Sequence, residues 1–574
     1  MQNLTIVSFI FFTGLVGLIT YLKLKGNNKR NQSKDAYFLG GRSLTGGVIG
    51  ASLLLTNLSA ANFVGMSGQS YSGNMSNMAY EVTSGLVLVV VAMYLVPRYL
   101  KQGITTVPDF LEDRYDSGVK KSISILFLLC YVLNLLPTTL YSGAIALSQI
   151  FNLESTFGIS YQMSIWITVW SIGIIGYVYA VIGGLKAIAV SDLYNGIGLA
   201  VSGLLVPFFG LLYLGKGSFS QGLSYMVSTA PEKLNAVGGA NDPVPFGAAM
   251  TGLLLVNLYY WGTDQSIIQR ALAAKNLKEG QKGVILAGLL KVMTPLIVII
   301  PGIIAFQIFG GGAVNPDLMY SKLVNAVMPK YLTGFFAAAM FGAVLSTFTG
   351  VLNSASTLFA LNVYGPIFGK GKSDKELVSK AKSFGLIIAG VSMIIAPFIM
   401  YAPQGLFQYL QIVNGFFNVP IFTIVFIGYV TKRVPAIAAK VSLVFFVGTY
   451  AILQLVIKPD LNFLYQLAIL FVLSSALMLI IGKIKPRETD YVMEIRNVVD
   501  IEPWEHRHVA GGVVVFLMIS MYILFSKLGV ASVNGITIYT FGYMLIVAII
   551  ITLAVIFIKR KDSEKIKKNE AKAA

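Results

Sequence analysis

Four ionisable side chains lie in or beside long apolar runs of the sequence: Glu81, Asp192, Asp264 and Lys291. At the centre of a membrane helix each would cost about 2.5–3.5 kcal/mol on insertion scales, so the set calls for a function. Glu81 and Asp192 lie near the ends of their runs, where an interfacial position is the simpler explanation, whereas Lys291 lies deeper. Because a carboxylate such as Glu81 accepts hydrogen bonds and an ammonium such as Lys291 donates them, these two groups suit a pocket for a polyhydroxylated solute. Side chains that could complete it are Asn62, Ser84, Asn257 and Gln411.

Neighbouring aromatic and hydroxyl residues suggest two further roles. Tyr260 and Trp261 offer a flat apolar face against which a ring could stack or a gate could close. Ser346 and Thr347 lie together in FGAVLSTFTGVLNSAST, where such hydroxyls often simply bond their own helix. A monovalent cation needs several oxygens, and a broken helix supplies free carbonyls. If the two helices touch, these hydroxyls could form a cation site with the carbonyls of Leu55, Leu58 and Ala343.

The composition indicates that these groups lie in a polytopic membrane protein. Of 574 residues, 56% are apolar and only 12% are charged, with a mean hydropathy of +0.74, whereas soluble chains carry about 25% charged residues. A soluble enzyme, a disulfide scaffold and a disordered chain are poor fits. Cys130 is alone and cannot form an internal disulfide, and His506 with His508 is a weak metal signal. With no catalytic constellation and no GxxxxGK[ST] loop, neither an enzyme nor an ATP-driven pump is expected.

Fifteen apolar segments are long enough to be spans. They lie at about 4–24, 46–71, 79–97, 122–150, 162–184, 189–215, 246–268, 283–309, 331–362, 383–402, 405–430, 435–457, 461–482, 509–526 and 535–558.

The basic residues predict the orientation of these spans. The net charge is +18, and with the N-terminus outside, 36 of the 43 Lys and Arg residues fall in segments assigned to the inside. An excess of Lys and Arg marks cytoplasmic loops. The sequence therefore predicts an external N-terminus and a cytoplasmic C-terminus, and the charge indicates topology rather than a nucleic-acid partner.

Two of the spans contain polar interruptions at membrane depth. The span at 46–71 holds Thr56-Asn57-Leu58-Ser59, and the span at 246–268 holds Asn257 and the run Gly262-Thr263-Asp264-Gln265. Small residues alone could merely permit close helix packing, but interrupted helices at corresponding places of two halves point to a transporter site. Five spans per half give inverted repeats. The predicted units are 1–45 (an extra span and a basic loop), 46–215 (first repeat), 216–245 (external loop), 246–430 (second repeat), 431–558 (additional spans) and 559–574 (a basic cytoplasmic tail).

At these residues the chain resembles the sodium/solute symporter family, in particular its bacterial sodium/galactose (sodium/glucose) branch and the uncharacterised symporters near it. The matching blocks are FLGGRSLTGGVIGASLLLTNLSAANFVGMSG, VIGGLKAIAVSDLYNGIGL, LLVNLYYWGTDQSIIQRALAAKNLKEGQKG, GVLNSASTLF and LFQYLQIVNGFFNVP. The resemblance implies an all-α, LeuT-like core of two inverted five-helix repeats with flanking helices, and alternating access coupled to sodium.

The resemblance also implies site residues. The sugar pocket falls on Asn62, Glu81, Ser84, Asn257, Lys291 and Gln411. The inner gate falls on Tyr260 with Trp261 beside it, and the outer gate on Met66, Tyr80 and Phe407. The sodium site falls on Leu55, Leu58, Ala343, Ser346 and Thr347, with Asp192 on the sodium exit path.

Five positions depart from the family pattern. Asn62 stands where the galactose branch has the longer Gln, so a hydrogen bond to sugar is lost or redirected. Thr347 replaces Ser but keeps the hydroxyl. The family's Trp-Thr-Asp reads Val190-Ser191-Asp192, and Asn195 stands where Gln is usual. Sodium use is therefore better supported than galactose identity.

The sequence thus predicts a secondary transporter in a bacterial cell membrane. It would import a neutral, hydroxyl-rich solute, in first place a monosaccharide such as galactose or glucose, together with sodium. A different solute (a sialic acid, inositol or an amino acid) is the main alternative. A transporter-like sensor is a weaker one, since such proteins normally append an output domain.

Overall fold

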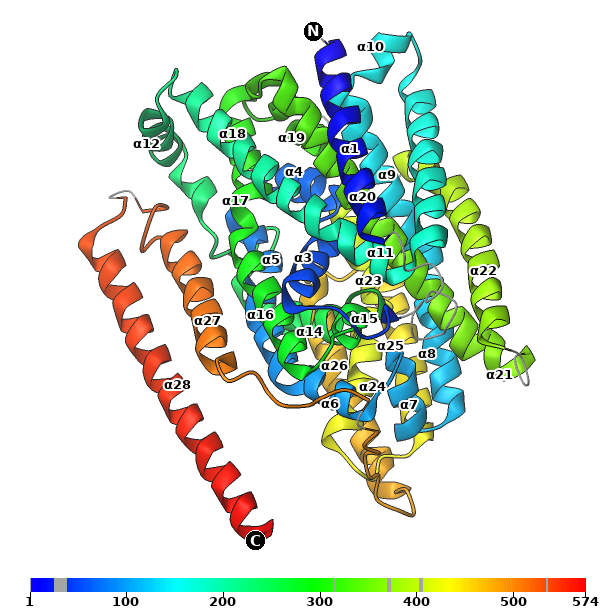
Figure 1. Cartoon of the computed structure of the whole chain (residues 1–574). Helices are drawn as coiled ribbons and strands as arrows, with labels where there is room; N and C mark the ends of the chain where they lie inside the picture. The colour runs from blue at the N-terminus through cyan, green and yellow to red at the C-terminus, as the bar shows by residue number, and fades with distance from the viewer. Residues whose placement is uncertain are drawn as a thin grey trace.

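The computed structural model describes residues 2–24, 39–312, 316–368, 373–401, 406–496, 498–532 and 535–573. In these ranges the chain forms helices and loops, with one isolated bridge between Leu44 and Ala274. Figure 1 shows the helices gathered into one bundle, with the N-terminus at one end and the C-terminus at the other.

Most predicted spans are present as helices. Among the described residues, 12 helices are long and apolar enough to cross a membrane, or up to 14 if each of two bent pairs counts as one span. The helices of the predicted spans are α1 (Gln2–Leu24); α3 (Gly46–Asn57), η2 (Asn62–Met66) and α4 (Ser67–Ser72); α5 (Met78–Val90), η4 (Val91–Leu95) and α6 (Val96–Gln102); α8 (Ser117–Cys130), η5 (Tyr131–Leu135) and α9 (Leu136–Ile150); α11 (Tyr161–Leu214); α16 (Leu277–Met293), α17 (Pro295–Val298) and α18 (Ile300–Phe309); α20 (Lys330–Leu358); α22 (Asp374–Ile395); α23 (Leu406–Gly415) and α24 (Asn418–Val430); α25 (Ala436–Ile452); α26 (Phe463–Ile484); α27 (Arg507–Leu524); and α28 (Ile538–Ala573).

The predicted count of fifteen is one above this range, and the difference lies at 246–268. Here α13 (Phe246–Ala248), η7 (Ala249–Leu253) and α14 (Leu254–Gly262) form one helical run that stops at Thr263. The next helix, α15 (Gln265–Leu272), starts two residues after this stop. The polar break therefore leaves a helix that is too short to count as a full span.

The segment predicted as two spans, 162–184 and 189–215, is one continuous helix in the structure. Helical hydrogen bonding runs through the 54 residues of α11, and its two apolar stretches, Tyr161–Ala180 and Tyr194–Leu214, each qualify as a span. The sequence analysis located both stretches correctly but expected a loop between them.

Both predicted interruptions are present as helix breaks. The first pair of helices, Gly46–Asn57 and Asn62–Ser72, is bent by 59°, and Leu58 leaves the helical region with ψ near 77°. At the second break the Asp264 side chain caps α15 by accepting a hydrogen bond from the Ser266 amide, 2.8 Å away. A third bend, of 43°, separates α16 from α17, where Pro295 lacks an amide hydrogen for the helical ladder.

Close helix packing surrounds the first break. The helix α3 packs against α16, α11 and α20, and Gly283 makes the α3–α16 approach possible. A Cβ atom at Gly283 would lie 2.6 Å from the Cβ of Ile49, which is closer than real side chains come. The helix α20 is buried along most of its length, so the broken α3 packs against the interior of the bundle.

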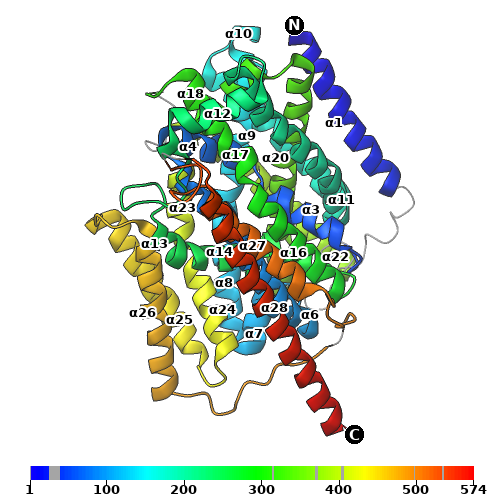
Figure 2. The same ribbon diagram turned by 90° about the vertical axis from the view of Figure 1, so that its left-hand side faces the viewer.

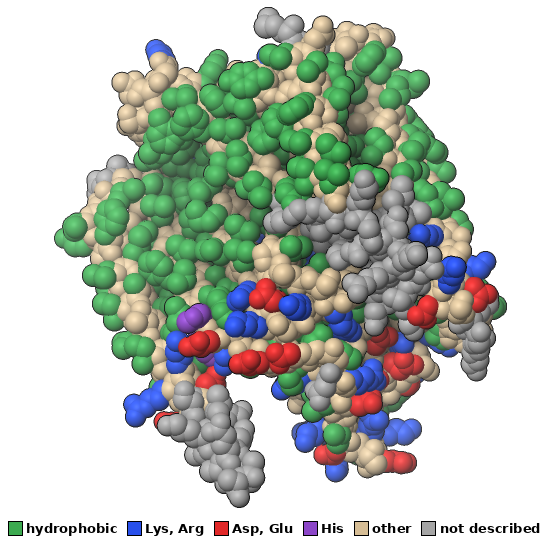
Figure 3. All heavy atoms as spheres, in the orientation of Figure 1, with side chains coloured by type: hydrophobic (Ala, Val, Ile, Leu, Met, Phe, Trp, Pro, Cys, Tyr) green, Lys and Arg blue, Asp and Glu red, His purple; other side chains and the backbone are tan. Residues whose placement is uncertain are grey.

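Charged side chains gather at the end of the molecule that holds the C-terminus. In Figure 3 this end is marked by Lys, Arg, Asp and Glu, whereas most of the visible face above it is hydrophobic. The visible face therefore combines an apolar belt with one strongly charged end.

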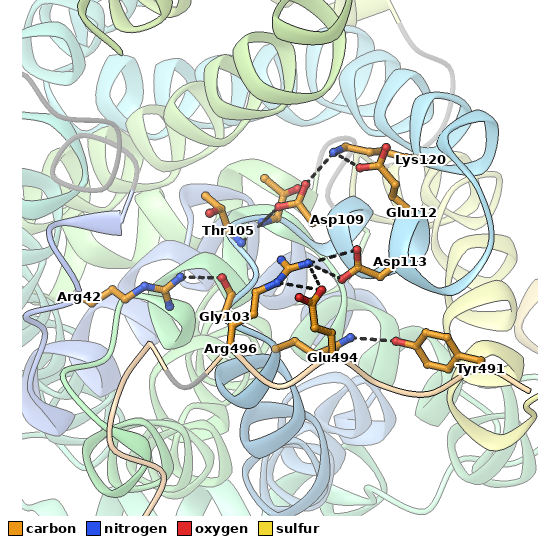
Figure 4. A network of polar contacts seen from close by, with 12 residues as sticks. Arg42, Gly103, Thr105, Asp109, Glu112, Asp113, Lys120, Tyr491, Glu494 and Arg496 are labelled. Carbon is orange, nitrogen blue, oxygen red and sulfur yellow. Dashed lines mark hydrogen bonds and ion pairs between the residues drawn. The ribbon is translucent and has the colours of Figure 1, made fainter. Parts of the chain in front are cut away.

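The 485–506 segment, which connects α26 to α27, crosses this charged end. Figure 4 shows Arg496 between Asp113 and Glu494, at 3.2 and 2.8 Å. The backbone of the segment also bonds distant helices, because the Trp504 amide donates to the Oε1 atom of Gln281, 2.8 Å away. At its start, Asp490 pairs with Arg433 at 2.6 Å, and this hydrogen bond holds the pKa of the Asp490 carboxyl below its usual value. The segment therefore ties together helix ends from both halves of the chain.

Candidate functional site

A cavity with about 150 Å³ of free volume lies between the two helix breaks. Its walls come from the α3 break, from α5, α14 and α20, from the η5–α9 helix, and from α23 and the start of α24. Its polar lining consists of Thr56, Asn57, Ser59, Asn62, Glu81, Ser84, Thr138, Thr139, Asn257, Asp264, Thr347, Gln411, Asn414 and Asn418. Five of the six residues predicted for the solute pocket are in this set, and Lys291 is the exception.

Lys291 lies behind Glu81 rather than on the cavity wall. Its Nζ atom, from α16, donates to the Glu81 carboxylate on α5 and to the Oδ1 atom of Asn57 at the end of α3. The two charged side chains are only 1% and 2% exposed. A buried ion pair persists only if each charge is compensated by its partner and by further hydrogen bonds, so Lys291 neutralises Glu81 and fixes its position.

Asn62 extends this polar group toward the cavity. Its Nδ2 atom donates to the Oε1 atom of Glu81 at 3.3 Å, and its Oδ1 atom accepts from the Ser59 hydroxyl at 3.0 Å. The shorter side chain that departs from the family pattern therefore contacts protein partners on both sides of its amide.

The remaining predicted pocket residues line the other sides. Asn257 on α14 donates to the Thr83 hydroxyl at 2.9 Å, and the Ser84 hydroxyl returns to the Tyr80 carbonyl at 2.8 Å. Gln411 comes from α23 and is half-buried. Amides and hydroxyls from separate helices thus face a common space.

The predicted gate residues form two aromatic pairs. The rings of Tyr80 and Phe407 meet edge to face with centroids 5.3 Å apart, and those of Tyr260 and Trp261 do so at 5.1 Å. All four line the cavity. Met66 does not line it; this residue is fully buried, and its sulfur lies 3.6 Å from the Nδ2 atom of Asn62.

The two helices of the predicted sodium site do touch. The Thr347 hydroxyl donates to the Thr56 carbonyl at 2.8 Å, and the hydroxyls of Ser346 and Thr56 lie 3.4 Å apart. In the described part of the chain, no hydrogen bond ends on the carbonyl oxygens of Leu55 or Leu58, since the nearby amides donate elsewhere. Leu55, Leu58 and Ala343 are buried.

One predicted residue of the cation path, Asp192, lies in α11, but its side chain is outside the described residues.

Asp264 is a buried centre to which the sequence analysis assigned no role. Its carboxylate accepts from the hydroxyls of Tyr131 (3.0 Å) and Tyr259 (3.1 Å), and from the amide and hydroxyl of Ser266. These donors come from η5, α14 and α15, so the group joins the second break to a helix of the first half. Its depth in an apolar run and its place before a new helix are the signals that indicated it.

Asn57 was also missed as a site residue, although it was noticed as part of the first interruption. Its amide oxygen accepts from Lys291 and its side chain lines the cavity. The TNLS run marks the break in the sequence, but not which of its residues would meet the lysine.

Comparisons with known proteins agree with this arrangement. The model of the family described as Sodium:solute symporter family matches residues 37–445. The chain is 46% identical over 529 residues to the "Uncharacterized symporter YidK" of Escherichia coli (strain K12), with 92% of both chains covered. It is 31% identical over 452 residues to the "Sodium/glucose cotransporter" of Vibrio parahaemolyticus, which covers 75% of this chain and 80% of that protein.

A solved structure shows the fold. The substrate-bound outward-open state of a Na⁺-coupled sialic acid symporter superposes with a TM-score of 0.70 at 20% identity, over 84% of this chain and 97% of that one. The fold is therefore the all-helical, LeuT-like fold that the sequence predicts. From the family model and the relatives together, the chain belongs to the sodium:solute symporter family and is a sodium-coupled solute transporter of the multi-pass membrane class.

Proposed function

We propose that the transporter imports a neutral, hydroxyl-rich solute, in first place a monosaccharide such as galactose or glucose. The observation that supports this is the neutralised Glu81–Lys291 pair behind a wall of amides and hydroxyls. Such a wall accepts and donates hydrogen bonds without net charge, and the rings of Tyr260 and Trp261 offer a face for stacking. Asn62, Glu81, Ser84, Asn257 and Gln411 would bind the solute, and Lys291 would hold Glu81.

Charge in the cavity argues against an anionic solute. The ammonium of Lys291 is committed to Glu81 and Asn57, and the two carboxylic side chains that line the cavity, Glu81 and Asp264, are acidic. A carboxylate-bearing solute would meet no free cation among the described lining residues. Inositol, a neutral polyol, is the alternative that these side chains fit best.

Sodium would bind at the α3 break. Carbonyls of Leu55, Leu58 and Ala343 and the hydroxyls of Ser346 and Thr347 supply the oxygens, and Asp192 would lie on the exit path. One charge crossing 100 mV yields about 2.3 kcal/mol, and a tenfold sodium gradient adds about 1.4 kcal/mol. At one-to-one coupling this supports roughly 500-fold accumulation of a neutral solute.

The basic end of the molecule would face the cytoplasm, with the N-terminus outside and the protein in a bacterial cell membrane. The excess of Lys and Arg at that end supports the orientation. The two repeats would then be 46–215 and 246–430, with the helices after 431 outside the core.

Uptake of radiolabelled galactose and glucose into proteoliposomes tests the proposal. A sodium gradient should drive accumulation of at least one of the two, and a potassium gradient of equal size should not. A thermal-shift screen of sugars, polyols and amino acids in sodium identifies the solute independently. Stabilisation by an amino acid alone, together with sodium-independent sugar uptake, would overturn the sugar assignment.

A further inference from the structure

A second cavity lies on the outside of the bundle, away from the solute site. It has a volume of about 670 Å³ and is bordered by α5, η4 and α6 on one side, by α28 on the other, and by α27 at its back. We call it the α5–α28 groove. In Figure 2, α27 and α28 run side by side in front of the bundle toward the end that holds the C-terminus. The long helix α28 has none of its apolar stretch buried, so the groove opens toward the membrane.

The upper part of the groove is apolar. Val89 and Met93 face it from one side, and Ile551 and Val555 from the other. At its back α27 carries Gly511 and Gly512. A Cβ atom at Gly511 would lie 2.9 Å from a methyl group of Val89, and one at Gly512 would lie 2.7 Å from a methyl group of Val555. The glycines therefore let α27 touch both walls, and at these two positions the back of the groove carries no side chain.

The length of the groove matches one leaflet of a bilayer. From Val89 to Lys101 the chain advances about 18 Å at 1.5 Å per residue, and from Ile551 to Asp562 about 16 Å. Half of a 30 Å hydrocarbon core is about 15 Å. An acyl chain lying in the groove would thus reach from the middle of the bilayer to its charged end.

Charged groups close that end. The basic residues Lys101, Arg507 and His508 border the groove there, and Asp562 is the one carboxylate among its described lining residues. Arg507 and His508 both contact the same oxygen of Asp562, each at 2.8 Å. Lys101 is half-buried and forms no ion pair with any described residue. The end of the groove is therefore net cationic, with Lys101 available to an anion.

We propose that the α5–α28 groove binds an anionic phospholipid, with its acyl chains along α5 and α28 and its phosphate at Lys101 and Arg507. Basic pockets between membrane helices at the cytoplasmic side suit anionic headgroups. The combination of an apolar length of one leaflet with a cationic end is specific to such a lipid, since a soluble anion would need no apolar length. The bound lipid would connect α28, which otherwise packs mainly on α27, to the transport core.

Native mass spectrometry of the whole detergent-purified protein tests this, with phosphatidylglycerol and phosphatidylcholine offered separately. Phosphatidylglycerol should be retained preferentially. Lys101→Ala and Arg507→Ala should each lower its retention by about fivefold, the effect of one basic residue near an anionic surface. Lys121→Ala is the matched control, because Lys121 is an exposed lysine at the start of α8 that does not border the groove, and it should change nothing.

Asp562→Asn separates loss of charge from loss of fold. It removes the competing carboxylate and should raise phosphatidylglycerol retention, whereas mere disruption of the α27–α28 contact would lower it. Equal retention of the two lipids, no difference between Lys101→Ala and Lys121→Ala, or a fall in Asp562→Asn would each overturn the proposal.

Discussion

Thr347 of α20 donates its hydroxyl to the carbonyl oxygen of Thr56, 2.8 Å away, in the last turn of α3. The contact joins residues almost three hundred positions apart at the point where α3 stops. It holds the broken end of α3 against a buried helix, and the carbonyls of Leu55 and Leu58 belong to the same end. Removing this contact should therefore weaken sodium binding more than it lowers the stability of the fold.

Replacing both hydroxyl residues, Ser346→Ala with Thr347→Ala, should abolish stimulation of uptake by sodium. The single change Thr347→Ala should raise the sodium concentration for half-maximal uptake by about fivefold, since one hydrogen bond contributes about 1 kcal/mol. Thr347→Ser keeps the hydroxyl and serves as the control. Sodium titration of uptake in proteoliposomes measures the effect, and unchanged sodium dependence in the double variant would remove these residues from the cation site.

Tyr260 should matter through its ring rather than its hydroxyl. Tyr260→Ala removes the edge-to-face partner of Trp261 and one wall of the cavity. An aromatic contact contributes about 1 kcal/mol beyond the effect of its buried area, so solute affinity should fall at least fivefold. Tyr260→Phe preserves both contacts and should stay near the wild-type affinity. Solute titrations at saturating sodium compare the two, and equal losses would show that the hydroxyl is what the solute contacts.

Sequence patterns located the helices and most cavity residues because hydropathy and polar interruptions are local signals. Glu81, Lys291 and both breaks stood out against apolar surroundings. What the pattern could not supply was pairing across the fold. Lys291 was expected on the cavity wall. A buried ammonium is stable only beside a carboxylate, however, and Lys291 forms its ion pair with Glu81 behind the wall.

The same limit applies to Asp264. Its depth was evident, but its donors Tyr131 and Tyr259 come from helices that only the fold brings together. The predicted loop within α11 was wrong for a different reason. The sequence showed two separate apolar stretches, but helical hydrogen bonding continues through the residues between them.

Arg114 should be a purely structural residue. Its fully buried guanidinium donates to the carbonyls of Gly428 (2.9 Å), Thr431 (3.0 Å) and Val434 (3.1 Å), at and beyond the end of α24. Helix ends leave carbonyls without partners, and a planar fork of donors satisfies several at once. Arg114→Met should cost about 2–3 kcal/mol of stability, with Arg114→Lys intermediate. Thermal unfolding in detergent measures this; because Arg114 lies outside the cavity, solute affinity of the folded fraction should not change, and a lower affinity would contradict the structural role.

The Glu81–Lys291 pair allows stability and transport to be separated. Lys291→Met leaves the Glu81 carboxylate buried without its partner, which should cost about 3–5 kcal/mol and lower the unfolding temperature. Adding Glu81→Gln removes the uncompensated charge, so the double variant should regain most of this stability. It should still fail to accumulate solute, because the charged acceptor beside Asn62 is gone and the position of the side chain is no longer fixed by Lys291.

Glu81→Gln alone leaves an unpaired ammonium and should be as unstable as Lys291→Met. Thermal unfolding and uptake, measured on the same preparations, give the two readouts. Wild-type uptake by a restabilised double variant would mean that the pair only holds α5, α16 and the end of α3 together, and that the solute is bound by the amides and hydroxyls alone.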